Sequence, residues 1–109
     1  MFQPTVRQPR VVDQPSLEEM LANVLRNTGW IMAGGSAQFR QGALSELQAN
    51  LGMIHLHTID QRVANAAKVL GEKAIVIASR NVNDVDAIMG LGRVLKEFES
   101  AVKTCLARR

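Results

Sequence analysis

Residues 59–80, IDQRVANAAKVLGEKAIVIASR, decide the fold class of this chain because they fit two different structures. If the stretch is helical, its apolar residues recur at helical spacing and form one stripe: Ile59, Val63, Ala66, Leu70 and Ile77. If the chain instead breaks at Gly71, residues 74–79 form a buried strand. The first structure belongs to a helical bundle, and the second belongs to a mixed fold.

The segment 53–58, MIHLHT, offers the same choice because its residues alternate between apolar and polar. Short strands at 53–58 and 74–79 would give an α+β fold that needs a second copy or another partner to complete its sheet. The all-α alternative is favoured because no proline follows Pro15 and aromatic residues are few, with three Phe, one Trp and no Tyr. We therefore predict an all-α chain and keep the α+β fold as the alternative.

Helix boundaries are marked by capping residues and glycines. Ser16 and Glu19 form a capping box that begins the first helix, and Gly34-Gly35 ends it. Ser36 is the predicted N-cap of the second helix and Asn83 that of the last.

The central part of the chain carries a seam that loses its phase near residue 54. The seam steps by four and three residues through Arg40, Leu44, Leu47, Leu51 and Ile54. Either one long central helix is kinked near 52–57, or it is interrupted there and Thr58 caps a new helix. The prediction is a small bundle of three to four helices.

Residues 1–15 are predicted to form an extended, flexible arm, and 16–109 a single helical domain. All three prolines lie in the arm, and each follows a glutamine. The arm is either a loose terminus or a segment that docks onto a neighbouring subunit, with Val11-Val12 as its anchor and Arg7 and Arg10 as charge contacts.

No catalytic or metal-binding constellation stands out. His55 and His57 supply fewer ligands than the three or four that zinc usually takes. The single cysteine, Cys105, lies on an apolar helix face, where thiols are inert. Gly90-Leu91-Gly92 lacks the preceding strand and following lysine of a phosphate loop, so we attribute these glycines to the close approach of another helix. We expect no enzyme activity, no metal and no cofactor.

The termini and the hydropathy pattern suggest a cytoplasmic protein. MFQPTVRQPR has no apolar core of a signal peptide, and no window reaches the ~18 apolar residues of a membrane span. We therefore expect no membrane partner.

The function that this pattern favours is a non-enzymatic interaction or assembly protein that self-associates through apolar helix faces. Such a protein could be an adaptor, a chaperone-like cofactor or a structural subunit of a phage or secretion system. The reason is an excess of apolar residues over what one short bundle can cover, and symmetric dimers are the commonest way to cover them. The residues expected to contact another copy or another protein are Trp30, Leu44, Leu47, Leu51, Ile54, Ile75 and Ile77.

The alternative function is a small basic accessory protein that binds nucleic acid through the arm and the basic helix ends. The formal net charge is +3, from 13 basic and 10 acidic residues, which permits an acidic partner without requiring one. The residues expected at such an interface are Arg7, Arg10, Arg40, Arg108 and Arg109.

Overall fold

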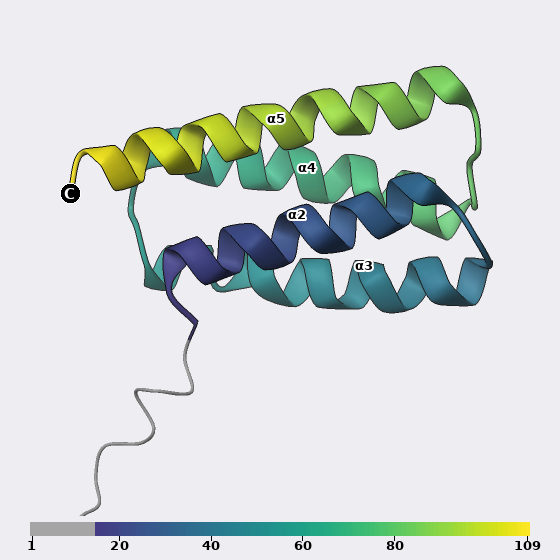
Figure 1. Ribbon diagram of the computed structural model, residues 1–109, viewed down its shortest axis with the longest axis horizontal. Helices are drawn as coiled ribbons and strands as arrows, with labels where there is room; N and C mark the ends of the chain where they lie inside the picture. The colour runs from purple at the N-terminus through teal and green to yellow at the C-terminus, as the bar shows by residue number, and fades with distance from the viewer. Residues whose placement is uncertain (1–14) are drawn as a thin grey trace, which may run out of the picture.

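The computed structural model describes residues 15–109, which form four α-helices and one turn of 3-10 helix (Figure 1). The elements are α2 (Leu17–Ala33), α3 (Ala37–Gly52), η1 (Ile54–Leu56), α4 (Gln61–Ser79) and α5 (Val85–Ala107). The all-α prediction is confirmed, and within residues 15–109 there is no strand. The predicted arm, including Arg7 and Arg10, lies outside the described residues except for its last position.

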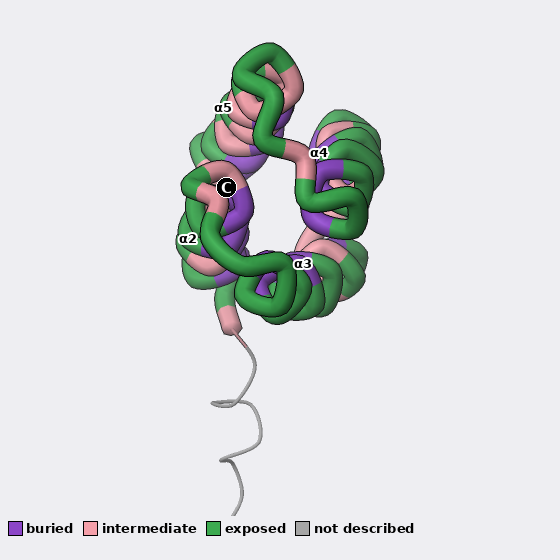
Figure 2. The backbone as a smooth tube through the Cα atoms, turned by 90° about the vertical axis from the view of Figure 1, so that its right-hand side faces the viewer, coloured by how far each residue is buried: buried purple, intermediate pink, exposed green. Residues whose placement is uncertain are grey.

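The four helices run up and down along one bundle axis, as short connections between successive helices require (Figure 1). α2 packs against α3 and α5, and α4 packs against the same two helices from the opposite corner. Seen end-on, α2 and α4 are therefore diagonal neighbours, and the buried residues of all four helices face the interior (Figure 2).

The helix starts are set by side chains that accept backbone N–H groups. Ser16 and Glu19 form the predicted capping box, and the Ser36 hydroxyl accepts the Phe39 amide at 3.1 Å. Two of the other predicted caps are wrong by one or two residues. Asp84 rather than Asn83 caps α5, with its carboxylate accepting from Ala87 at 3.1 Å, and Asp60 rather than Thr58 caps α4. In both cases the capping residue is a carboxylate that lies one or two positions closer to the helix than the predicted cap. Its negative charge is also stabilised by the positive N-terminal end of the helix dipole.

The deciding stretch forms one continuous helix, α4, so the predicted strand at 74–79 does not exist. Ala67 and Ala74 join Val63, Leu70 and Ile77 to complete the buried stripe. Gly71 does not break the helix. A Cβ at this position would lie 3.5 Å from the Leu51 side chain, which is an ordinary van der Waals distance, so the packing of α3 on α4 does not require a glycine here. Ile59, expected on this stripe, precedes the helix and is 98% exposed.

The phase change near residue 54 is an interruption. α3 ends at Gly52, and η1 carries the chain into the connection that leads to α4. The second predicted strand, 53–58, is therefore this 3-10 turn and its flanking residues. The alternation of apolar and polar residues does not separate an inner face from an outer one, because Ile54 is buried and Met53 partly buried, whereas His55 and Leu56 are both exposed.

The inner seam of α2 includes two polar residues, Asn27 and Thr28, which are both fully buried. Neither the amide of Asn27 nor the hydroxyl of Thr28 has a hydrogen-bond partner among the described residues. Position 27 lies on the seam because it follows Leu17, Met20 and Val24 at alternating spacings of three and four residues. Its polarity suggests the solvent face, but its angular position places it in the core.

Candidate interaction surface

Four of the residues predicted to contact a partner lie in the core of the bundle. Leu44, Leu47, Ile54 and Ile77 are at most 5% exposed. The heptad-like spacing of Leu44, Leu47 and Ile54 describes how α3 and η1 pack within the same chain, and Ile77 belongs to the buried stripe of α4. For these four residues the predicted role as an intermolecular surface is therefore wrong.

Trp30 does reach the surface, at the end of α2. It is 41% exposed, and its ring packs at a tilt on Phe39 with 5.7 Å between the ring centroids. The Arg26 guanidinium lies over the indole, 5.8 Å from its centroid. Such contacts stabilise the aromatic pair locally and leave about half of Phe39 open to solvent. These three residues form an exposed aromatic corner beside the α2–α3 connection.

Leu51 and Ile75, the remaining predicted partner residues, line one groove between α3 and α4. Leu51 is partly buried and Ile75 is 40% exposed. The groove is mainly apolar, and its apolar lining includes Leu51, Ile54, Ile59, Ala64, Ala67 and Ile75. The structure thus brings Leu51, Ile54 and Ile75 together and leaves Trp30 at the connection between α2 and α3.

The outward side of α4 carries aliphatic side chains that the sequence reading missed. Val69 is 40% exposed and Val76 is 47% exposed, and both line a second groove, between α4 and α5. Gly90 lies in the same groove, and a Cβ built on it would meet nothing within 4 Å. α4 is consequently flanked by a groove on each side. The missed signal was a second apolar spacing, Val69 to Val76, which repeats after seven residues on the side opposite the buried stripe.

Arg40, predicted to contact nucleic acid, is fully buried and fastens three segments together. Its Nε donates to the Ile31 carbonyl at 3.0 Å, near the end of α2. One terminal nitrogen donates to the Asn81 side chain and to the Val82 carbonyl, both at 2.9 Å, in the α4–α5 connection. Among the described residues no carboxylate forms an ion pair with Arg40. Carbonyl and amide oxygens therefore accept the hydrogen bonds that water would accept from an exposed guanidinium. Arg40 is thus a packing residue, and its predicted place in a nucleic-acid interface is wrong.

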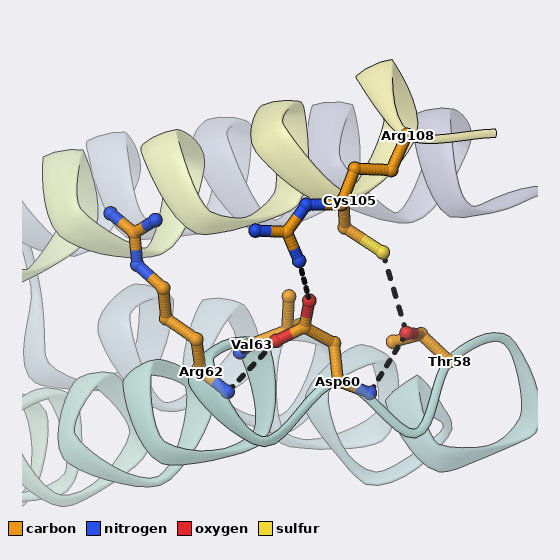
Figure 3. A network of polar contacts seen from close by, with 6 residues as sticks. All are labelled: Thr58, Asp60, Arg62, Val63, Cys105 and Arg108. Atoms are coloured by element: carbon orange, nitrogen blue, oxygen red, sulfur yellow. Dashed lines mark hydrogen bonds and ion pairs between the residues drawn. The ribbon is translucent and has the colours of Figure 1, made fainter.

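Both C-terminal arginines contact the connection that leads into α4, and Figure 3 shows the contact of Arg108. Arg108 lies 3.7 Å from the Asp60 carboxylate, which also accepts the Arg62 and Val63 amides at the start of α4. Arg109 donates to the His57 carbonyl.

Beside this ion pair, Thr58 shares a hydrogen bond of 3.4 Å with the buried Cys105 thiol. The same hydroxyl accepts the Asp60 amide at 3.0 Å. The arrangement fastens the end of α5 to the start of α4, which gives these polar residues a role in the fold.

Two further properties bear on what the surface can do. Within residues 15–109, no three His, Cys, Asp or Glu side chains come together as a potential metal site, and His55 and His57 lie in and just after η1. None of the helices described is both long and apolar enough to cross a bilayer.

Comparison with known proteins supplies no relative. Neither the scan against protein-family models nor the searches of curated proteins and of solved structures returned a match. The surface itself therefore carries the functional argument.

Proposed function

We propose that this chain is a non-enzymatic interaction and assembly protein that self-associates through apolar helix surface. The observation that carries the proposal is exposed aliphatic surface on both flanks of α4, with Ile75 in the groove toward α3 and Val69 and Val76 in the groove toward α5, each at least 40% exposed. Single exposed aliphatic residues are ordinary, but exposed aliphatic residues that line grooves are typical of an interaction site.

The grooves beside α4 fit this proposal because most of their lining comes from helices, although Thr58 and Ile59 of the α3–α4 connection also line the groove toward α3. In helix-in-groove recognition an amphipathic helix lays its apolar face into a hydrophobic groove. Gly71 lines the groove toward α3, and Ala87 and Gly90 line the groove toward α5. A helix of a second copy or of another protein, seated in either groove, would cover the exposed aliphatic residues that line it.

Sedimentation velocity of the full chain tests the proposal over concentrations from micromolar to near-millimolar. The expected result is a sedimentation coefficient that rises with concentration toward that of a dimer. A species that stays monomeric over the whole range would overturn self-association. An apolar dye that reports exposed patches provides a second measurement, since its fluorescence should fall as the dimer forms.

The alternative function, binding of nucleic acid, now depends on fewer residues. Arg40 is buried, Arg108 is paired with Asp60, and Arg7 and Arg10 lie outside the described residues. We keep it as a second proposal for the arm and Arg109, with a direct test. Binding to DNA or RNA that weakens steeply with salt would support it, and absence of binding at low salt would remove it.

A further inference from the structure

The first turns of α5 carry a short surface stripe, defined as Asp86, Met89, Gly90 and Arg93 and called the α5 stripe. At about 100° per residue, Asp86 and Arg93 lie within about 20° of each other around the helix and two turns apart, with the other two residues between them. Leu91, which is fully buried, lies on the opposite side of the helix. Because α5 occupies a corner of the bundle, the α5 stripe faces away from the core (Figure 2).

The α5 stripe is not used within its own chain. Neither of the two ion pairs within residues 15–109 involves Asp86 or Arg93. These two residues are about 10 Å apart along the helix, which is too far for them to pair with each other. Met89 is 59% exposed, and a Cβ built on Gly90 would meet nothing within 4 Å. The stripe is therefore open surface that carries two opposite charges without ion-pair partners.

The groove beside this stripe has a composition that suits a second copy of the chain. Asp86, Gly90 and Arg93 also line the groove between α4 and α5. The charged lining of this groove consists of two acidic and two basic side chains, so it has no net charge. Val69 and Val76 contribute exposed aliphatic surface from α4. A strongly acidic or basic partner gains nothing overall from such a surface, whereas a surface with the same mixture of charges can complement it.

We infer that two copies of this chain associate through the α5 stripe, with their α5 helices antiparallel about a two-fold axis that crosses the helix halfway between Asp86 and Arg93. This inference rests on the proposed self-association and specifies its interface. A two-fold contact uses the same patch on both subunits and requires that patch to be complementary to itself. The α5 stripe meets this requirement because its two charges are opposite, lie on one face of the helix and are equidistant from the axis.

The two-fold axis places each charge against its opposite. In an antiparallel pair, a residue on one side of the axis lies opposite the residue that is equally far from the axis on the other side. Asp86 of each copy therefore faces Arg93 of the other, which gives two attractive contacts. Met89 of one copy lies beside Met89 of the other next to the axis, and Gly90 leaves room for the two backbones to approach. The aliphatic residues of the adjoining groove, Val69 and Val76, flank the second helix.

Charge determines the direction of the pairing. If the two α5 helices were parallel, with the two-fold axis along them, Asp86 would face Asp86 and Arg93 would face Arg93. Like charges held opposite one another destabilise an interface, while opposite charges fix its register. The antiparallel arrangement is the one in which both charged contacts are attractive.

Charge-reversal variants of the full chain test this interface, with dissociation constants measured by sedimentation. Asp86→Lys makes both members of each charged contact basic, and Arg93→Glu makes both acidic. Either variant alone should weaken its homodimer about tenfold or more, because two attractive contacts become repulsive. The double variant D86K/R93E reverses both contacts at once and should return to within about threefold of the wild type.

A mixture of the two single variants provides the sharpest arm of the test. Chains carrying D86K should pair with chains carrying R93E about as tightly as wild-type chains pair, since each contact then joins opposite charges. Met89→Asp, which brings two carboxylates together next to the axis, should abolish the dimer. Ile59→Asp is the matched control, because Ile59 is an exposed aliphatic residue outside the α5 stripe.

Cross-linking through introduced cysteines tests the direction of the helices. Met89→Cys places its two thiols next to the axis, so mild oxidation should join two chains through a disulfide. Ser100 lies on the same face of α5, and in the antiparallel dimer its two copies are roughly 30 Å apart. Ser100→Cys is therefore the matched control and should not cross-link, whereas both variants would cross-link in a parallel dimer. The native Cys105 is buried, so wild-type chains should not cross-link.

The outcomes separate this inference from the proposed function. A wild-type dimer that is indifferent to D86K, R93E and M89D overturns the α5 interface and leaves self-association standing. A wild-type monomer removes both. Circular dichroism of each variant below the wild-type dissociation constant shows whether its monomer is folded, so that loss of dimer is not mistaken for unfolding. The antiparallel pairing is also overturned by single variants that neither the double variant nor mixing rescues, or by S100C chains that cross-link as readily as M89C chains.

Discussion

Replacing Arg40 with methionine tests whether this buried side chain stabilises the bundle. The substitution removes the donors to the carbonyl oxygens of Ile31 and Val82 and to the amide oxygen of Asn81. A hydrogen bond from a charged donor contributes roughly 1.5–3 kcal/mol, so three of them give a gross loss of roughly 5–9 kcal/mol. Removing the guanidinium also removes the cost of burying it, which is several kcal/mol. The difference predicts that Arg40→Met lowers the free energy of unfolding by about 3 kcal/mol.

Urea unfolding followed by circular dichroism measures this change directly. A domain of this size typically has ~5–15 kcal/mol of stability, so the variant should remain folded with a lower midpoint. Arg93→Met on the exposed side of α5 is the matched control, and it should change stability by no more than about 0.5 kcal/mol. If the free energy of unfolding of Arg40→Met lies within about 0.5 kcal/mol of the wild-type value, the three hydrogen bonds contribute nothing net and the reasoning is refuted.

Arg40→Lys separates geometry from charge at the same position. Lysine keeps the charge but concentrates its donors at one nitrogen, whereas arginine reaches α2 with Nε and the α4–α5 connection with a terminal nitrogen. We expect this variant to be less stable than the wild type by about 2 kcal/mol. Wild-type stability in Arg40→Lys would show that a positive charge suffices and that the fork-shaped donor set is dispensable.

Three other predictions concern single positions. Thr28→Val should raise the free energy of unfolding by about 1 kcal/mol, because it replaces a buried hydroxyl that has no partner among the described residues; a loss of stability in urea unfolding would contradict this. Gly90→Ala should also stabilise the monomer by about 1 kcal/mol, since there is open space around its Cβ, while Gly34→Ala should cost about 2 kcal/mol because its φ is +92°. Thermal unfolding of the two glycine variants should therefore shift in opposite directions, and shifts of the same sign would count against the backbone argument. Cys105, which is 8% exposed, should react with a thiol reagent far more slowly in native buffer than in denaturant, and rapid native labelling would show that the end of α5 opens.

The sequence predicted the elements better than it predicted the surface. Ser16, Ser36 and the glycines after residue 33 act locally, so their roles as helix boundaries could be read from a few neighbouring residues. The choice between helix and strand at 74–79 was harder, because a run such as Ala-Ile-Val-Ile-Ala suits either structure. Packing against the other helices decides it, and that information is not local.

The candidate site was harder to predict because periodicity identifies a stripe without saying what covers it. Leu44 and Leu47 have the spacing of an interface seam, and the bundle itself provides the partner. Arginine is usually found in surface contacts, but Arg40 is buried because it lies on the same seam as Leu44 and Leu47. Val69 and Val76 were not predicted as surface residues because an apolar pair seven residues apart on α4 becomes meaningful only when the main stripe is known to face inward.

The alternating direction of the four helices gives the molecule two unlike poles. Residue 15 and Arg109 lie at one pole, whereas Trp30 and Phe39 lie at the other, separated by the length of α2, or roughly 25 Å (Figure 1). A fluorescent label or solid support attached after Arg109 would stand at the far pole and leave the aromatic pair unobstructed. Immobilised chains would thus display one defined pole to any molecule in solution.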